Sequence, residues 1–173
     1  MSAKAQHWLF AVTAAVLVCG ALAVVNWPRI ASATAASQFN SVILARSFFE
    51  KIVIRSGEDE RVDYAKVQLV ANDPSDVYVV KNTVAPGGDS GWHLHPGPSL
   101  VLVSTGMATV YDGGDPSCTP VRYPAGTGFS DPAGRVHLVR NESGVPLETV
   151  AFQIVPAGAS RRIDAPSPGF CPF

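Results

Sequence analysis

Glycine and proline interrupt this sequence so often that no amphipathic helix of useful length is expected after residue 33. The 173 residues include 15 glycines and 14 prolines, and short runs rich in β-branched residues stand between them. Such runs, bounded by turn residues, are typical of strands in a β-sandwich or barrel. The sequence therefore predicts one all-β domain. The main expected strands are residues 77–84, 100–104, 107–111, 119–123, 128–130, 136–140 and 147–155, with Thr105 and Gly106 as the turn of a hairpin.

The first 33 residues have the order of a secretory signal. Lys4 precedes an apolar run from Trp8 to Val25, and the small residues Ala31-Ser-Ala33 follow. The run is long for a signal and short for a membrane span, so an uncleaved anchor helix is the alternative. Either reading predicts a secreted or otherwise extracytoplasmic domain. We expect residues 1–33 to be the signal or anchor, 34–41 a linker, and 42–173 the folded domain with a C-terminal tail.

Two cysteines follow the N-terminal segment, Cys118 and Cys171. In an oxidising compartment an even pair is most simply explained by a disulfide. A metal role is disfavoured because neither has a second cysteine or a histidine near it in sequence. Two unpaired buried thiols are the less favoured alternative. We therefore predict a Cys118–Cys171 disulfide that holds the tail against the domain.

The charge of the chain is nearly balanced, at −1. No run or stripe of basic residues stands out, as it would in a protein that binds a phosphate backbone. The sequence thus argues against a nucleic-acid partner.

All histidines except His7 lie between residues 93 and 137. His93 and His95 alternate, so in a strand both would point to one face. His137 falls in another β-rich run and could meet them from a neighbouring strand of a barrel. Three neutral imidazoles suit zinc, iron, copper or nickel and leave coordination positions open. A His-x-His pair alone is weak evidence for a metal, and the residues around it decide its weight.

The surrounding residues resemble the two motifs of the cupin superfamily. The first motif, G-x5-H-x-H-x3,4-E-x6-G, is matched over residues 87–106, and the second, G-x5-P-x-G-x2-H-x3-N, over 126–141. Nine residues fall at the required spacings: Gly87, His93, His95 and Gly106 in the first motif, and Gly126, Pro132, Gly134, His137 and Asn141 in the second. One position departs, because Ser99 stands where the first motif has glutamate.

The resemblance implies a single cupin barrel, a double-stranded β-helix or jelly roll, with a divalent metal held by His93, His95 and His137. Ser99 is a poor ligand beside a carboxylate, so a three-histidine site is expected, and no replacement for the glutamate is evident. Similar three-histidine cupins include thiol dioxygenases and diketone-cleaving enzymes. Iron is therefore the favoured metal, with zinc, manganese, nickel and copper as alternatives.

Two functions follow from the resemblance. The first is a metal-dependent, dioxygenase-like oxidoreductase that acts on a small molecule, although no catalytic acid or base can be assigned. The alternative is a non-catalytic cupin that binds a metal or small ligand, which the loss of the glutamate favours. The fold alone does not decide between them. The expected partners are a small-molecule substrate or ligand, a membrane if the N-terminus is an anchor, and a second copy of the chain, since cupins are often homodimers.

Overall fold

The computed structural model describes residues 32–56 and 66–173. The chain divides into two units, residues 1–30 and 31–173, and every described residue belongs to the second. The predicted signal or anchor thus lies outside the described residues, except for its last two positions. The described part consists of strands, turns and loops, as the all-β prediction requires. It contains no helix that could cross a membrane.

Twelve strands make up the described domain. Their bounds are β1 Ser37–Phe49, β2 Ile52–Arg55, β3 Gln68–Ala71, β4 Ser75–Asp89, β5 His93–Leu94, β6 Ser99–Thr105, β7 Met107–Asp112, β8 Val121–Pro124, β9 Gly128–Asp131, β10 His137–Arg140, β11 Leu147–Pro156 and β12 Ile163–Asp164.

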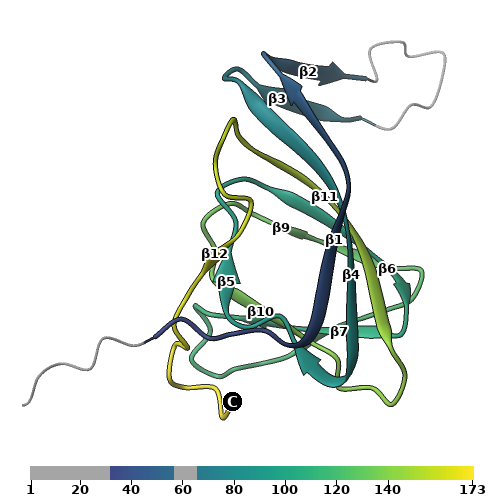
Figure 1. Ribbon diagram of the computed structural model, residues 1–173, viewed down its shortest axis with the longest axis vertical. Helices are drawn as coiled ribbons and strands as arrows, with labels where there is room; N and C mark the ends of the chain where they lie inside the picture. Colours follow the sequence, from purple (N-terminus) through teal and green to yellow (C-terminus); the bar gives the residue numbers. More distant parts are fainter. Residues whose placement is uncertain (1–31, 57–65) are drawn as a thin grey trace, which may run out of the picture. The chain divides into compact units, whose positions relative to one another are not determined.

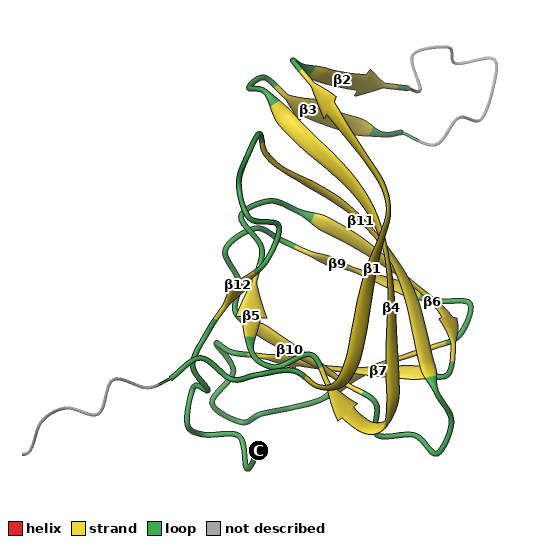
Figure 2. Cartoon of the chain, viewed as in Figure 1, coloured by secondary structure: helices red, strands yellow, loops and turns green. Residues whose placement is uncertain are grey.

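The strands form a nearly closed antiparallel barrel (Figures 1 and 2). One side runs β1-β4-β11-β6-β9, and the other runs β12-β5-β10-β7-β8. The sides join where Arg140 of β10 pairs with Asp89 at the end of β4. Among the described strands, β2 and β3 pair only with each other, as a separate two-stranded sheet. This is the double-stranded β-helix expected from the sequence, and its inward-facing side chains can meet across the interior.

The predicted hairpin at Thr105-Gly106 is wrong, although strands do flank it. β6 pairs with β9 and β11, whereas β7 pairs with β8 and β10, so the chain crosses here from one side of the barrel to the other. Gly106 has φ +74°, and a Cβ there would lie 2.6 Å from the carbonyl oxygen of Pro146. The glycine therefore serves a corner between the two sides, which has the same local sequence signal as a hairpin turn.

The expected linker over residues 34–41 is also wrong, because most of it is folded. Residues 37–41 open β1, which pairs with β4 along its length. Thr34 precedes the strand and is anchored as well: its amide donates to the carbonyl of Ala165, and its hydroxyl accepts from the amide of Trp92. This polar stretch carries little strand propensity of its own, and long-range pairing with β4 supplies its hydrogen bonds.

The C-terminal tail is tied to the barrel by the predicted disulfide. Cys118 and Cys171 are bonded, with Cα atoms 5.5 Å apart and 53 residues between them in sequence. Closing a loop of that length stabilises a fold by roughly 4 kcal/mol in the chain-entropy treatment. Cys171 packs in a buried cluster with Trp92 and Leu138, which neighbour His93 and His137 in sequence. Since side chains alternate along a strand, this cluster supports the faces of β5 and β10 opposite those two histidines.

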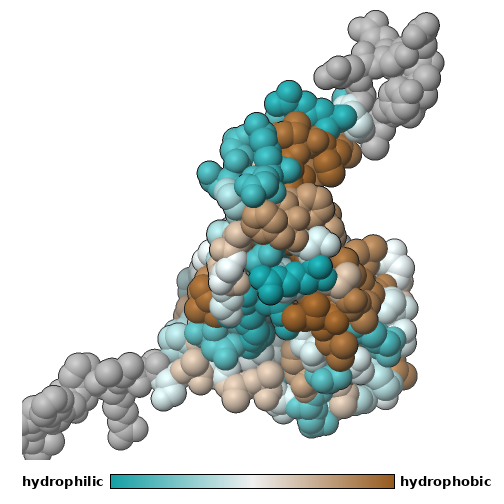
Figure 3. Space-filling model, turned by 45° about the horizontal axis from the view of Figure 1, so that its top comes forward, coloured by the Kyte–Doolittle hydropathy of each residue, from teal (hydrophilic) through white to brown (hydrophobic). Residues whose placement is uncertain are grey.

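Many large apolar side chains remain at the surface of the described domain. They occur on β1, on β2 and β3, and on β6, and Figure 3 shows several separate hydrophobic areas on the face it presents. Leu100 and Leu102 are 58% and 57% exposed, on the face of β6 that points away from the interior. The homodimer implied by the cupin resemblance stays a prediction, and these side chains are the surface available to it.

Candidate metal centre

The three predicted histidines meet inside the barrel. His93 in β5 pairs directly with His137 in β10, and His95 follows β5 by one residue. Their ring centroids lie 4.2 Å apart for His93 and His137, 4.9 Å for His93 and His95, and 5.4 Å for His95 and His137. One ligand nitrogen from each ring lies within 4.8 Å of the others. The sequence motifs therefore bring these three side chains to one point.

Backbone carbonyls fix which nitrogen of each ring carries the proton. Nδ1 lies 2.9 Å from the Gly91 oxygen in His93, 2.6 Å from the Arg161 oxygen in His95, and 3.0 Å from the Arg135 oxygen in His137. A carbonyl oxygen can only accept, so Nδ1 must be the donor in each case. In neutral rings this leaves the Nε2 lone pairs free. Metal-ligating histidines are typically oriented in this way, through a hydrogen bond from the nitrogen that does not bind the ion.

The site is buried, and burial keeps imidazoles uncharged. The three histidines are 5–7% exposed. Burial lowers the pKa of His93, and it lowers the pKa of His95 to about 4, because the imidazolium ion loses hydration. The remaining basic groups nearby act in the same direction. At neutral pH both rings therefore offer a lone pair rather than a positive charge.

The donor set fits a divalent transition metal. Metal–nitrogen bonds of about 2.1 Å allow two ligand atoms on one ion to be at most about 4.2 Å apart. Nitrogens within 4.8 Å of one another need only a small closing movement of the rings to share an ion. Three imidazoles in neutral form suit iron, zinc, copper or nickel and leave positions open for other groups.

A buried carboxylate that sequence reasoning missed lies beside the histidines. Asp131 ends β9, and its side chain is 7% exposed. Its Oδ2 lies 3.7 Å from Nε2 of His95, and its Oδ1 lies 3.6 Å from Nδ1 of His137. Burial raises the pKa of Asp131, and Oδ2 has no hydrogen-bond partner in the described structure. Burying a carboxylate oxygen without a hydrogen-bond partner costs free energy, so the position of Oδ2 needs an explanation.

Ser99, the residue at the motif glutamate position, faces the same site. It is buried, and its hydroxyl accepts a 3.3 Å hydrogen bond from Nε2 of Gln153. The same amide nitrogen lies 3.3 Å from Nδ1 of His95. Ser99 thus belongs to a polar row next to His95, and no sequence pattern indicated the part played by Gln153.

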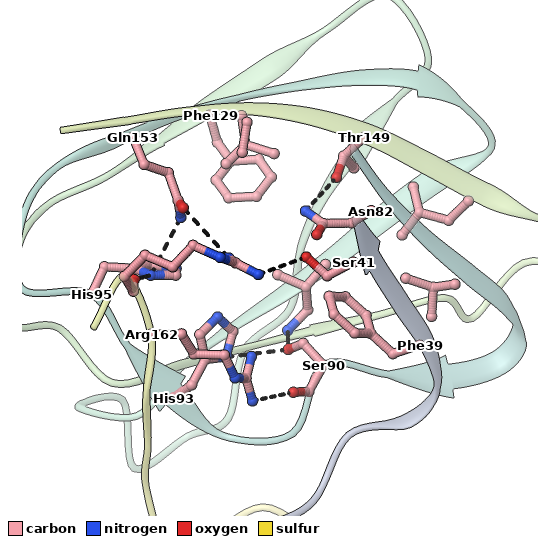
Figure 4. A pocket seen from close by; sticks show the side chains of 16 residues that line it. Phe39, Ser41, Asn82, Ser90, His93, His95, Phe129, Thr149, Gln153 and Arg162 are labelled. Atoms are coloured by element: carbon pink, nitrogen blue, oxygen red, sulfur yellow. Dashed lines mark hydrogen bonds between the residues drawn. The ribbon is translucent and has the colours of Figure 1, made fainter. Parts of the chain in front are cut away.

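A cavity opens from His93 and His95 into the barrel (Figure 4). Its volume is about 100 Å³, room for a small molecule. Its wall combines an apolar part with polar groups, among them His93, His95 and Gln153. The apolar part is formed mainly by Phe39, Val84, Val101, Phe129, Leu147 and Ala151.

Two arginines from the tail also line the cavity, Arg161 and Arg162. They arrive there because β12 pairs with β5, so the segment before β12 runs beside the histidines. Arg162 is partnered: its Nε donates to Asp164, and its Nη2 donates to the carbonyl of Ser90. Arg161 donates to the hydroxyl of Ser41 at 2.8 Å and lies 3.5 Å from Oε1 of Gln153. The tail was expected only to be pinned by Cys171, and its contribution to the cavity was not foreseen.

The comparisons with known proteins agree with the observed fold and with the sequence motifs. Residues 81–153 match the cupin domain family. A double-stranded β-helix protein from Klebsiella pneumoniae is 24% identical over 51% of this chain and 74% of that chain, with a TM-score of 0.44. A cupin domain from Bordetella pertussis is 28% identical over 45% of this chain and 80% of that chain, with a TM-score of 0.39.

A structure of oxalate oxidase is 24% identical over 47% of this chain and 46% of that chain, with a TM-score of 0.40. The match thus spans less than half of that enzyme. No curated protein matches the sequence.

The domain is an antiparallel β-barrel in which three histidines from two strand segments converge. This arrangement is typical of small metal-binding barrel domains. The family match covers all three histidines and the whole of both motifs. Residues 81–153 therefore form a cupin domain, as the motif spacing indicated.

The protonation of the three rings can be measured directly. In metal-free protein at pH 7, ¹⁵N NMR should find the Nδ1–H form at all three rings, because each Nδ1 donates to a carbonyl. On acidification His95 should bind its proton near pH 4, since burial opposes the charged form. Titration of His95 near the ordinary pKa of about 6.5, or an Nε2–H form at any ring, would contradict this geometry.

Proposed function

We propose that this protein is an extracytoplasmic, metal-dependent oxidoreductase of the dioxygenase type that acts on a small molecule inside the barrel. The observation that carries the proposal is the convergence of three histidines, two of which, His93 and His95, line a cavity. A metal with a purely structural role would need the three imidazoles but no cavity beside them. The disulfide supports the compartment, since such bonds persist outside the cytoplasm.

His93, His95 and His137 would hold the metal through Nε2, with iron as the favoured ion. When bound, such an ion supplies redox and Lewis-acid chemistry next to the cavity. The protein's own contribution is to hold the three rings in place through their Nδ1–H bonds and to exclude bulk water from the site. A dioxygenase adds both atoms of O₂ to its substrate, so the reaction needs no separate electron donor.

The cavity favours a small anionic substrate, and Arg161 carries that part of the proposal. Among residues 32–56 and 66–173, no carboxylate lies within ion-pair distance of its guanidinium. Burial, together with the nearby charge of Arg162, lowers its pKa. A half-buried cation without a counter-ion is stabilised by an anion, and guanidinium groups bind carboxylates through two parallel hydrogen bonds. The substrate class is therefore a small carboxylic acid with an apolar part.

Metal-dependent turnover tests the function. Purified protein loaded with Fe²⁺ should take up O₂ in the presence of a carboxylic acid from a panel of small candidates. His137→Ala should lose most of the bound iron and the O₂ uptake, because two imidazoles remain and the geometry is lost. Ser99→Ala, which keeps all three rings, is the matched control and should retain its iron.

Wild-type protein that holds iron and binds a small acid without consuming O₂ would instead favour the non-catalytic binding module. Iron content unchanged in His137→Ala would contradict the three-histidine site.

Removing the positive charge of Arg161 tests the substrate class. Arg161→Gln should weaken binding of carboxylates by roughly tenfold to a hundredfold, the usual loss when a hydrogen bond to a charged group is removed. Binding of the corresponding neutral amides should change little, and Arg161→Lys should recover part of the loss. Isothermal titration of metal-loaded protein measures this. Arg122→Gln, at an exposed arginine away from the cavity, is the control, and equal losses for acids and amides would refute the anionic class.

A further inference from the structure

The cross-strand register places Asp131 next to the position that lacks the motif glutamate. Ser99 of β6 pairs directly with Asp131 of β9, and two residues along, Val101 pairs with Phe129. Val101 and Phe129 both line the cavity, so the alternation of a strand puts Ser99 and Asp131 on the inward face too. Directly opposed residues have Cβ atoms about 5 Å apart. A carboxylate at 131 therefore enters the same region as one at 99, from the neighbouring strand.

The carboxylate of Asp131 points at the histidines and lacks a partner there. Oδ2 lies 3.7 Å from Nε2 of His95, the nitrogen whose lone pair is free, and it accepts no hydrogen bond within the described structure. Two atoms bound to one ion lie up to about 4.2 Å apart, so this separation already permits a shared metal. By contrast, Ser99 Oγ is engaged by Gln153.

An orienting role toward His137 explains the arrangement less well. Oδ1 of Asp131 lies 3.6 Å from Nδ1 of His137, which is too long for a hydrogen bond. That Nδ1–H is already donated to the carbonyl of Arg135 at 3.0 Å. Such a role would also leave Oδ2 buried without a partner, whereas a cation beside His95 would satisfy it.

We propose that Asp131 is the fourth protein ligand of the metal, a carboxylate supplied by β9 in place of the glutamate that β6 lacks at Ser99. The inference rests on the proposed metal centre. It makes the donor set three imidazoles and one carboxylate, so the net charge of the divalent ion with its protein ligands falls from +2 to +1. A carboxylate in the set suits iron or manganese and disfavours Cu(I), which prefers thiolate and thioether ligands.

The test is Co²⁺ binding by full-length wild-type protein and by Asp131→Asn, followed by visible absorption and by competition with a chelator. Asp131→Asn should bind Co²⁺ about a hundredfold more weakly, with a changed ligand-field spectrum. Loss of a residue that only hydrogen-bonds to a ligand costs up to about a hundredfold, and loss of a ligand should cost at least as much. The metal-free variant should melt no lower than wild type, because a neutral amide replaces an unpaired buried carboxylate. Asp112→Asn makes the same charge change at a carboxylate that pairs with Arg135, and it should leave both affinity and spectrum unchanged.

The double variant Ser99→Glu/Asp131→Ser separates ligation from an orienting role. It returns the carboxylate to β6 and removes it from His137, so the Co²⁺ affinity should recover to within about tenfold of wild type if Asp131 is a ligand. Failure to recover in a folded protein, or an unchanged spectrum in Asp131→Asn, would overturn the inference while leaving a three-histidine centre intact. Wild-type protein that binds no Co²⁺ would overturn the metal centre itself, and the inference with it.

Discussion

Three hydrogen bonds from imidazole Nδ1 to backbone carbonyls are the interactions on which the site depends. They come from different parts of the chain: two carbonyls lie two residues before His93 and His137, and the third belongs to Arg161 in the tail. Each bond sets the direction of a ring and leaves Nε2 as the only atom with a lone pair. Burial lowers the pKa of His93 and of His95, so these two rings stay neutral and keep a lone pair for a metal.

The surrounding architecture maintains these bonds. The tail reaches the site through the pairing of β12 with β5, and the disulfide at Cys171 holds its end against the outer face of β5 and β10. The Pro96-Gly97-Pro98 turn is equally constrained, since a Cβ at Gly97 would lie 1.8 Å from the carbonyl oxygen of Ile154. That close approach lets the chain pass from His95 to Ser99 over β11. Tail, turn and barrel therefore act together to hold the three histidines in place.

The motif histidines were predictable from the sequence because ligation restricts residue type and spacing along the chain. The strands were largely predictable for a similar reason, since β-branched runs alternate with turn residues. What depends on long-range pairing was missed. The register of β9 with β6 places Asp131 beside the histidines, and the pairing of β12 with β5 brings Arg161 to the cavity. Neither pairing can be read from the local sequence. The hairpin at Gly106 failed because a corner between two sides of a barrel carries the same local signal as a tight turn.

Diffraction from crystals of the metal-loaded protein, with anomalous data at the absorption edge of the metal, would show whether the three histidines bind one ion through Nε2. We expect one anomalous peak inside the barrel, about 2.1 Å from Nε2 of His93, His95 and His137, with each Nδ1 still bonded to its carbonyl. A peak elsewhere, coordination through Nδ1, or fewer than three imidazoles on the ion would contradict it.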